Sequence, residues 1–130
     1  GIMSDKGTPK HNIPRSTSED FLRISSNFKG IDVLCTHESP IVPEYGHKFD
    51  SGIGPAAMVK VIEKVKPKIS VSGHLTFVKS YTISKIGKSI TIRIESGQAN
   101  KHFVLIKPSE NEVVMWNNEH IEEKVQVHLI

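Results

Sequence analysis

Two histidines each follow an apolar run with the composition of a β-strand. His37 lies in the segment IDVLCTHESP (residues 31–40), and His74 directly follows the segment KPKISVSG (residues 66–73). Neutral imidazoles are good ligands for first-row divalent metals, and with carboxylate or amide oxygens they suit manganese, iron, zinc or nickel. Such a metal can generate hydroxide near neutral pH. The two histidines predict a divalent metal site if the fold brings them together.

The elements between the histidines determine whether they meet. The sequence predicts a strand over residues 31–36, a helix over 55–65 and a second strand over 68–73. Two strands joined by a helical crossover are normally parallel, so their carboxyl ends emerge at the same sheet edge, where ligands often bind. For one histidine alone, a hydrogen bond to a loop carbonyl is the better explanation. The shared edge favours the metal, and Gly73 could let the backbone approach the site closely.

The rest of the chain predicts a mixed α/β (α+β) fold in one domain over residues 1–130. Residues 1–16 indicate a short strand and loop, and a helix is expected over 17–28, with a capping box formed by Ser16 and Glu19. Gly30 is expected to end this helix. The βαβ unit then occupies residues 17–76. Residues 77–130 alternate with a period of two between turn signals, which predicts an antiparallel meander.

Short motifs in this order resemble the calcineurin-like metallophosphoesterase family. The segment THESP (residues 36–40) looks like the family's THxPP-type motif, and GHLT (residues 73–76) looks like its terminal G-H-x-H motif. The segments KVKPK (residues 64–68) and IESG (residues 94–97) are similar to the family's helix end and N-P-G turn. The strand-like GIM (residues 1–3) resembles the strand after the family's G-N-H motif. The resemblance implies the C-terminal half of an α/β/β/α sandwich.

The resemblance also implies roles for individual residues. His37 and His74 would bind one metal of the family's pair, whereas Thr76 stands where the family has its last histidine and would be a poor ligand. Glu38 and His47 are candidates for contact with substrate or with the metal ligands. No Asp-x-His or Gly-Asn-His occurs in the sequence. We therefore assign no catalytic residue and expect little or no phosphoester hydrolysis unless another chain supplies an N-terminal half.

Other classes of function remain open. A half-domain would expose sheet edges, so a non-catalytic module that self-associates or binds a partner is the alternative to an enzyme. The net charge of +3 permits nucleic-acid binding, but the basic residues are scattered and form no stripe. The sequence contains no apolar run long enough for a membrane span and no signal-peptide pattern, so we expect a cytoplasmic protein.

Two further residues have a structural interpretation. Cys35 is the only cysteine and lies within an apolar strand, so we expect a buried thiol with a packing role. His102 follows Asn100 and Lys101 at the start of a predicted strand, and we expect it at the surface.

Overall fold

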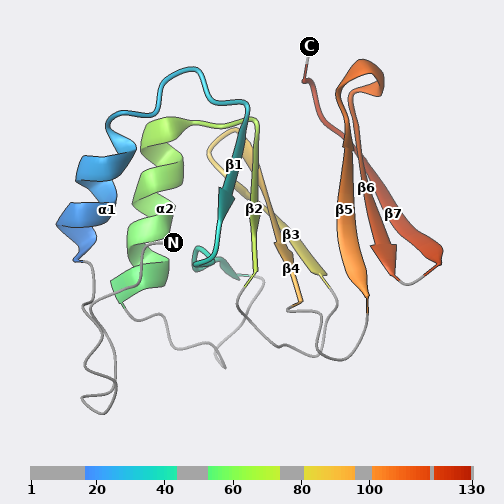
Figure 1. Cartoon of the computed structure of the whole chain (residues 1–130), viewed down its shortest axis with the longest axis horizontal. Coiled ribbons are helices and arrows are strands. Elements are labelled where there is room, and N and C mark those ends of the chain that lie inside the picture. Colours follow the sequence, from blue (N-terminus) through green and yellow to red (C-terminus); the bar gives the residue numbers. More distant parts are fainter. Residues whose placement is uncertain (1–16, 44–52, 74–80, 96–100, 118, 130) are drawn as a thin grey trace.

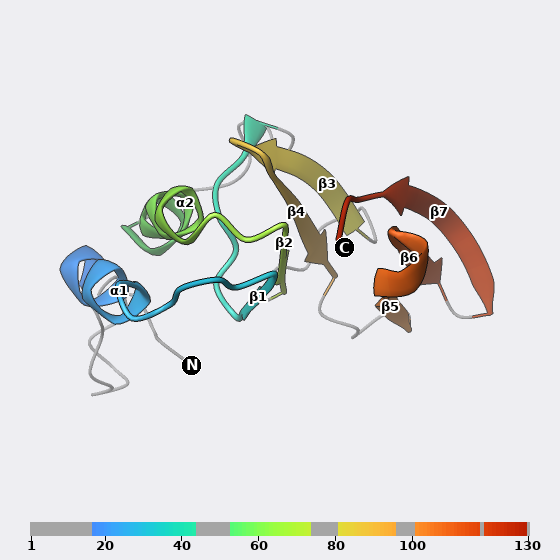
Figure 2. The same cartoon turned by 90° about the horizontal axis from the view of Figure 1, so that it is seen from above.

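In the part of the chain that the structure describes, two helices and two β-sheets form three layers, with the first sheet in the middle (Figures 1 and 2). The computed structural model describes residues 17–43, 53–73, 81–95, 101–117 and 119–129. The elements are α1 (Ser18–Ser25), β1 (Val33–Thr36), α2 (Ile53–Val65), β2 (Ile69–Ser72), β3 (Tyr81–Ile86), β4 (Ser89–Ile94), β5 (His102–Lys107), a 3₁₀ turn (Pro108–Glu110), β6 (Glu112–Asn117) and β7 (His120–Gln126). This confirms the mixed α/β class expected from the sequence.

The first sheet has the strand order β1-β2-β4-β3. Strand β2 pairs in parallel with β1 on one side and with β4 on the other. Thr36 lies opposite Ser72, and Ser72 lies opposite Arg93, so the carboxyl ends of three strands meet at one edge. The predicted βαβ unit is confirmed, with α2 as the crossover between β1 and β2.

The strands after residue 77 do not form a single meander. Strands β3 and β4 form an antiparallel hairpin that joins the first sheet, because β4 pairs in parallel with β2. Only β5, β6 and β7 form a separate antiparallel meander. The alternation of apolar residues predicted the strands and their hairpin pairing, but it contains no information about which sheet each hairpin joins.

The helical layer covers one face of the first sheet. Helix α2 carries apolar residues with helical spacing, and these pack with α1 and the middle of β1. The buried members of this core are Phe21, Leu34, Ala57, Met58, Val61, Ile62 and Val65. The opposite face of β2 is covered by the second sheet, and the core between the sheets contains Ile69, Ile92, Val113, Met115 and Val127. Strands β2 and β4 are therefore covered on both faces: Ile69 and Ile92 pack between the two sheets, and Ser70 and Thr91, on the other face, are also buried.

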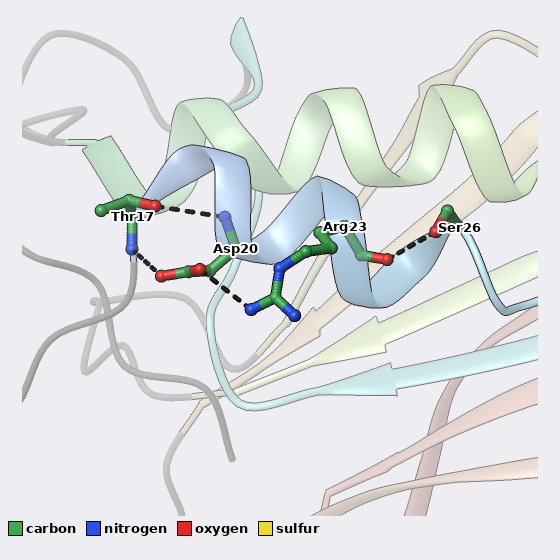
Figure 3. A network of polar contacts seen from close by, with 4 residues as sticks. All are labelled: Thr17, Asp20, Arg23 and Ser26. Atoms are coloured by element: carbon green, nitrogen blue, oxygen red, sulfur yellow. Dashed lines mark hydrogen bonds and ion pairs between the residues drawn. The ribbon is translucent and has the colours of Figure 1, made fainter.

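Helix α1 begins one residue later than the capping box predicted from Ser16 and Glu19. Thr17 is the N-cap: its Oγ1 accepts from the backbone N–H of Asp20 at 3.2 Å, and its own N–H donates to Asp20 Oδ2 at 2.9 Å (Figure 3). The helix ends at Ser25 rather than near residue 28. Gly30 lies beyond the helix end, with a φ of +64° that suits glycine. Neither helix of the described ranges is long and apolar enough to cross a membrane.

Candidate functional site

The carboxyl edge of the first sheet holds His37. This residue directly follows β1, and its side chain is exposed. Thr36, the last residue of β1, pairs with Ser72, the last residue of β2. The structure therefore places His37 at an edge where two parallel strands end side by side, as the sequence predicted.

Buried hydrogen bonds hold the loop after β1 against the end of β2. The hydroxyl of Ser39 donates to the carbonyl of Gly73 at 2.7 Å and shares a second hydrogen bond with Ser72 Oγ at 3.0 Å. Thr36 Oγ1 donates to the carbonyl of Glu38 at 2.8 Å, which closes a tight turn around His37. The backbone of His37 is thus fixed on both sides by contacts that the sequence analysis did not anticipate.

The same loop is also attached to the helical layer. The backbone N–H of Ile41 donates to the carbonyl of Pro55 in the first turn of α2, at 3.2 Å. Ser39 and Pro40 are both buried, so the middle of this loop packs against the protein interior while His37 stays exposed. The serine before the proline at the end of this strand is the sequence signal that could have indicated that the loop is attached to the neighbouring strand.

A cavity of about 200 Å³ opens beside His37, between α1, α2 and the end of β1. Its walls are mostly apolar, and the polar residues near it come from the strand end. The lining residues are Phe21, Ile24, Ser25, Phe28, Leu34, Cys35, Thr36, His37, Glu38, Met58 and Val61. An apolar pocket with a few polar groups at one end is the usual form of a small-molecule site. The structure therefore joins His37 and Glu38 to a cavity that the sequence did not reveal.

Three of the predicted site residues, His74, Thr76 and His47, lie outside the described residues. Of the described ranges, none contains a group of three or more His, Cys, Asp or Glu side chains that could hold a metal ion. A Cβ atom added at Gly73 would meet no described atom within 4 Å, so the close approach expected at Gly73 concerns a bound metal or ligand and stays a prediction. The carbonyl of Gly73 contributes to the edge by accepting a hydrogen bond from Ser39.

Cys35 is exposed, which corrects the expectation of a buried thiol. Its neighbour Leu34 faces the helical layer and is buried, so Cys35 lies on the opposite face of β1. Among the described strands β1 lies at the edge of the first sheet, and it contributes no residue to the core between the two sheets. The apolar composition of the strand suggested burial on both faces, but only one face of β1 is covered.

A buried arginine lies near the same edge, two strands from β1. Arg93 is 1% exposed, pairs with Ser72 across β2 and β4, and donates from Nη2 to Thr82 Oγ1 at 3.0 Å. A buried guanidinium needs partners that satisfy its donors. In SITIRIE (residues 89–95), polar residues alternate with isoleucines, a pattern that indicates a strand whose polar side chains share one face.

The side chain of His102 is buried, which corrects the expectation that this residue lies at the surface. The side chain is 3% exposed, and its Nδ1 lies 3.5 Å from Oε2 of Glu95, whose side chain is 8% exposed. Glu95 directly follows β4 and His102 begins β5, so the pair lies where the chain passes from the first sheet to the second. The hydrophilic residues before His102 are typical of a solvated strand end, so no local signal in the sequence indicates this pair.

No protein-family model matches the sequence, and a search of the curated proteins also finds no match. Two solved structures match the chain. A crystal structure of TT1561 of Thermus thermophilus is 16% identical, with a TM-score of 0.44, and the match covers 97% of this chain and 50% of that chain. A second crystal structure is 14% identical, with a TM-score of 0.49, over 97% of this chain and 46% of that chain. The chain spans about half the length of the solved structures it matches.

Proposed function

We propose that this chain forms part of a metal-dependent phosphoesterase in which His37 and His74 bind a divalent metal. The observation that supports this most directly is the pairing of Thr36 with Ser72 at the ends of two parallel strands. His37 is the residue after Thr36, and His74 is the second residue after Ser72. Ligands of open α/β sheets bind at this kind of edge, and the order of the motifs resembles the metallophosphoesterases.

The donor chemistry of the edge fits a first-row metal. His37 offers an exposed imidazole, and the adjacent Glu38 offers a carboxylate, a combination suited to manganese, zinc, iron or nickel. When bound, such a metal supplies an activated water for phosphoester hydrolysis. The residues of this chain would hold and orient the imidazole, since Ser39 and Thr36 fix the backbone around it. The remaining ligands, the bridging carboxylate and the proton donor would come from an N-terminal half.

The cavity beside His37 suggests where the substrate lies. Its apolar wall, which includes Phe21 and Phe28, suits the alcohol part of a phosphoester, with the phosphate directed toward His37 and Glu38. The volume of about 200 Å³ is below that of a typical drug-sized pocket, so the alcohol would be small.

Metal binding by single variants tests the proposal. Wild-type protein, His37→Ala and His74→Ala would be titrated with manganese or zinc in a calorimeter, with His120→Ala as the matched control because His120 is an exposed histidine of β7. We expect each site variant to bind at least about tenfold more weakly, since even the loss of an outer contact to a ligand has an effect of that size. Equal affinity in wild type, His37→Ala and His74→Ala would refute the proposal.

A second candidate function is self-association, which two surfaces favour. Strand β1 has a hydrogen-bonded strand on one side only among the described strands. On the second sheet, Phe103 and Ile121 are each 46% exposed. Unpaired strand edges and apolar surface are the features that a second copy of a chain can cover. Light scattering over a range of concentrations tests this, and a monomer at all concentrations would exclude it.

A further inference from the structure

The second sheet has an apolar outer face. Among the described residues, four large apolar side chains are exposed, and three of them, Phe103, Leu105 and Ile121, belong to this sheet. Val104 and Ile106 pack into the core between the sheets, so Phe103 and Leu105, which alternate with them in β5, lie on the opposite face. Large apolar side chains that gather on one face are typical of a surface that binds a partner.

An apolar row crosses this face from edge to edge. Phe103 pairs with Trp116 and Trp116 pairs with Ile121, so the three side chains lie next to one another on β5, β6 and β7. The rings of Phe103 and Trp116 are stacked, with their centroids 5.7 Å apart and their planes 7° from parallel. Aromatic residues of this kind are enriched at the centres of protein interfaces. A polar row closes the other end of the face and consists of Lys107, Glu112 and Gln126.

Neither described helix covers this face. Figure 2 shows α1 and α2 beside the first sheet, on the side away from the second sheet. The buried residues of both helices pack with Leu34 of β1 and belong to a different core from that between the sheets. The apolar row therefore gains free energy from any partner that removes it from water.

The charges beside the apolar row fit a second copy of the chain. Lys101 directly precedes His102 and Glu119 directly precedes His120, and both histidines pair with Asn117. Lys101 and Glu119 are exposed, and they therefore lie at the same level on opposite edges of the sheet. A two-fold axis parallel to β6 places β5 of one copy over β7 of the other. Each Lys101 then faces Glu119 of the second copy, so the opposite charges meet twice.

We propose that the chain forms a two-fold dimer through the outer face of its second sheet. In this dimer Phe103 packs against Ile121 of the second copy, and the two Trp116 side chains meet near the axis. The strands of the two facing sheets run in nearly the same direction, as they do when β-sheets pack face to face about 10 Å apart. The proposal rests on the self-association candidate above and names its surface, which is separate from the edge of β1 and from His37.

The fluorescence of Trp116 tests the location of the interface, because Trp116 is the only tryptophan of the chain. We expect its emission to shift to shorter wavelength, and its quenching by iodide to decrease, over the same concentrations at which light scattering detects the dimer. Phe103→Asp should raise the dissociation constant of the dimer at least about tenfold. Phe28→Asp is the matched control, because Phe28 is an exposed phenylalanine outside this sheet, and its dissociation constant should equal that of wild type.

A charge exchange tests the direction of the axis. Lys101→Glu and Glu119→Lys should each weaken the dimer about fivefold at low salt, because an exposed ion pair contributes little and the axis repeats it twice. The double variant Lys101→Glu/Glu119→Lys should restore the affinity of wild type. Failure of this restoration would overturn the proposed two-fold arrangement.

Two further outcomes would overturn the proposal. Self-association that Phe103→Asp leaves unchanged would place the interface on another surface, so the self-association candidate would stand and the outer face would not be its site. A chain that is monomeric at all concentrations would exclude both. Neither outcome affects the proposed metal site, because metal binding by His37→Ala and His74→Ala is measured separately by calorimetry.

Discussion

The hydroxyl of Ser39 donates a hydrogen bond of 2.7 Å to the carbonyl of Gly73. A hydroxyl carries one proton, so Ser72 must be the donor in the 3.0 Å contact between Ser72 Oγ and Ser39 Oγ whenever Ser39 donates to Gly73. Ser39 is 1% exposed, and these bonds join residues more than thirty positions apart in the chain. They fix the loop that begins at His37 to the end of the next parallel strand.

Replacement of Ser39 by alanine should therefore destabilise the fold. The change leaves the Gly73 carbonyl and the Ser72 hydroxyl without their buried partner, which costs about 1–3 kcal/mol of unfolding free energy. Urea unfolding measures the loss. Ser26→Ala is the matched control, because the Ser26 hydroxyl also donates to a backbone carbonyl but is exposed, and its loss should cost less. Equal effects of the two substitutions would contradict the role given to Ser39.

Cys35 should react readily with a thiol reagent in the native protein. Its side chain is exposed on β1, and it is the only cysteine, so a single reactive thiol is expected by colorimetric titration. Cys35→Ser should abolish the reaction. A thiol that reacts only after addition of denaturant would show that the exposed face of β1 is covered in solution.

The order of the elements was predictable, whereas the partners of the exposed and buried polar residues were not. Helical spacing in α2 and the apolar runs of β1 and β2 are local signals, so the parallel unit with His37 at its edge followed from the sequence. The exposure of Cys35 depends on where the second sheet ends, and the burial of the His102 side chain depends on how β5 packs on the first sheet. Both are long-range properties, and no local pattern of residues encodes them.

The capping interaction at the start of α1 should contribute measurably to stability. Thr17 and Asp20 exchange hydrogen bonds between side chain and backbone, and Arg23 Nη2 lies 3.1 Å from Asp20 Oδ1 (Figure 3). Thr17→Ala should cost about 1 kcal/mol of unfolding free energy, as measured in urea. If Thr17→Ser costs as much as Thr17→Ala, the hydroxyl is not the stabilising group.

The same network predicts a dependence on pH. The backbone hydrogen bond from Thr17, followed by the contacts with Arg23, lowers the pKa of Asp20 below its ordinary value. A lowered folded-state pKa means that the stabilisation is present above the pKa of the unfolded chain, about 3.9, and is lost as the pH falls through the folded value. Urea unfolding of wild type and Asp20→Asn should therefore differ at pH 7 and converge at acidic pH. A constant difference would indicate that the charge of Asp20 is not involved.

Tyr81 and Glu123 should form a titratable contact between the two sheets. Tyr81 begins β3 of the first sheet, Glu123 belongs to β7 of the second, and burial, together with the nearby charge and hydrogen bond of Glu123, raises the pKa of the Tyr81 phenol. A raised folded-state pKa means that this stabilisation is complete below the pKa of an unfolded tyrosine, about 10, and is lost as the pH rises through the folded value.

Ultraviolet titration measures the pKa of Tyr81 in a Tyr45→Phe background, which leaves Tyr81 as the only tyrosine. Glu123→Gln should lower the pKa of Tyr81 toward its ordinary value, although burial should keep that pKa above it. Lys124→Gln is the control, because Lys124 is exposed and its replacement should leave the pKa of Tyr81 nearly unchanged. A pKa that is the same in wild type and Glu123→Gln would show that the two sheets do not meet at this pair.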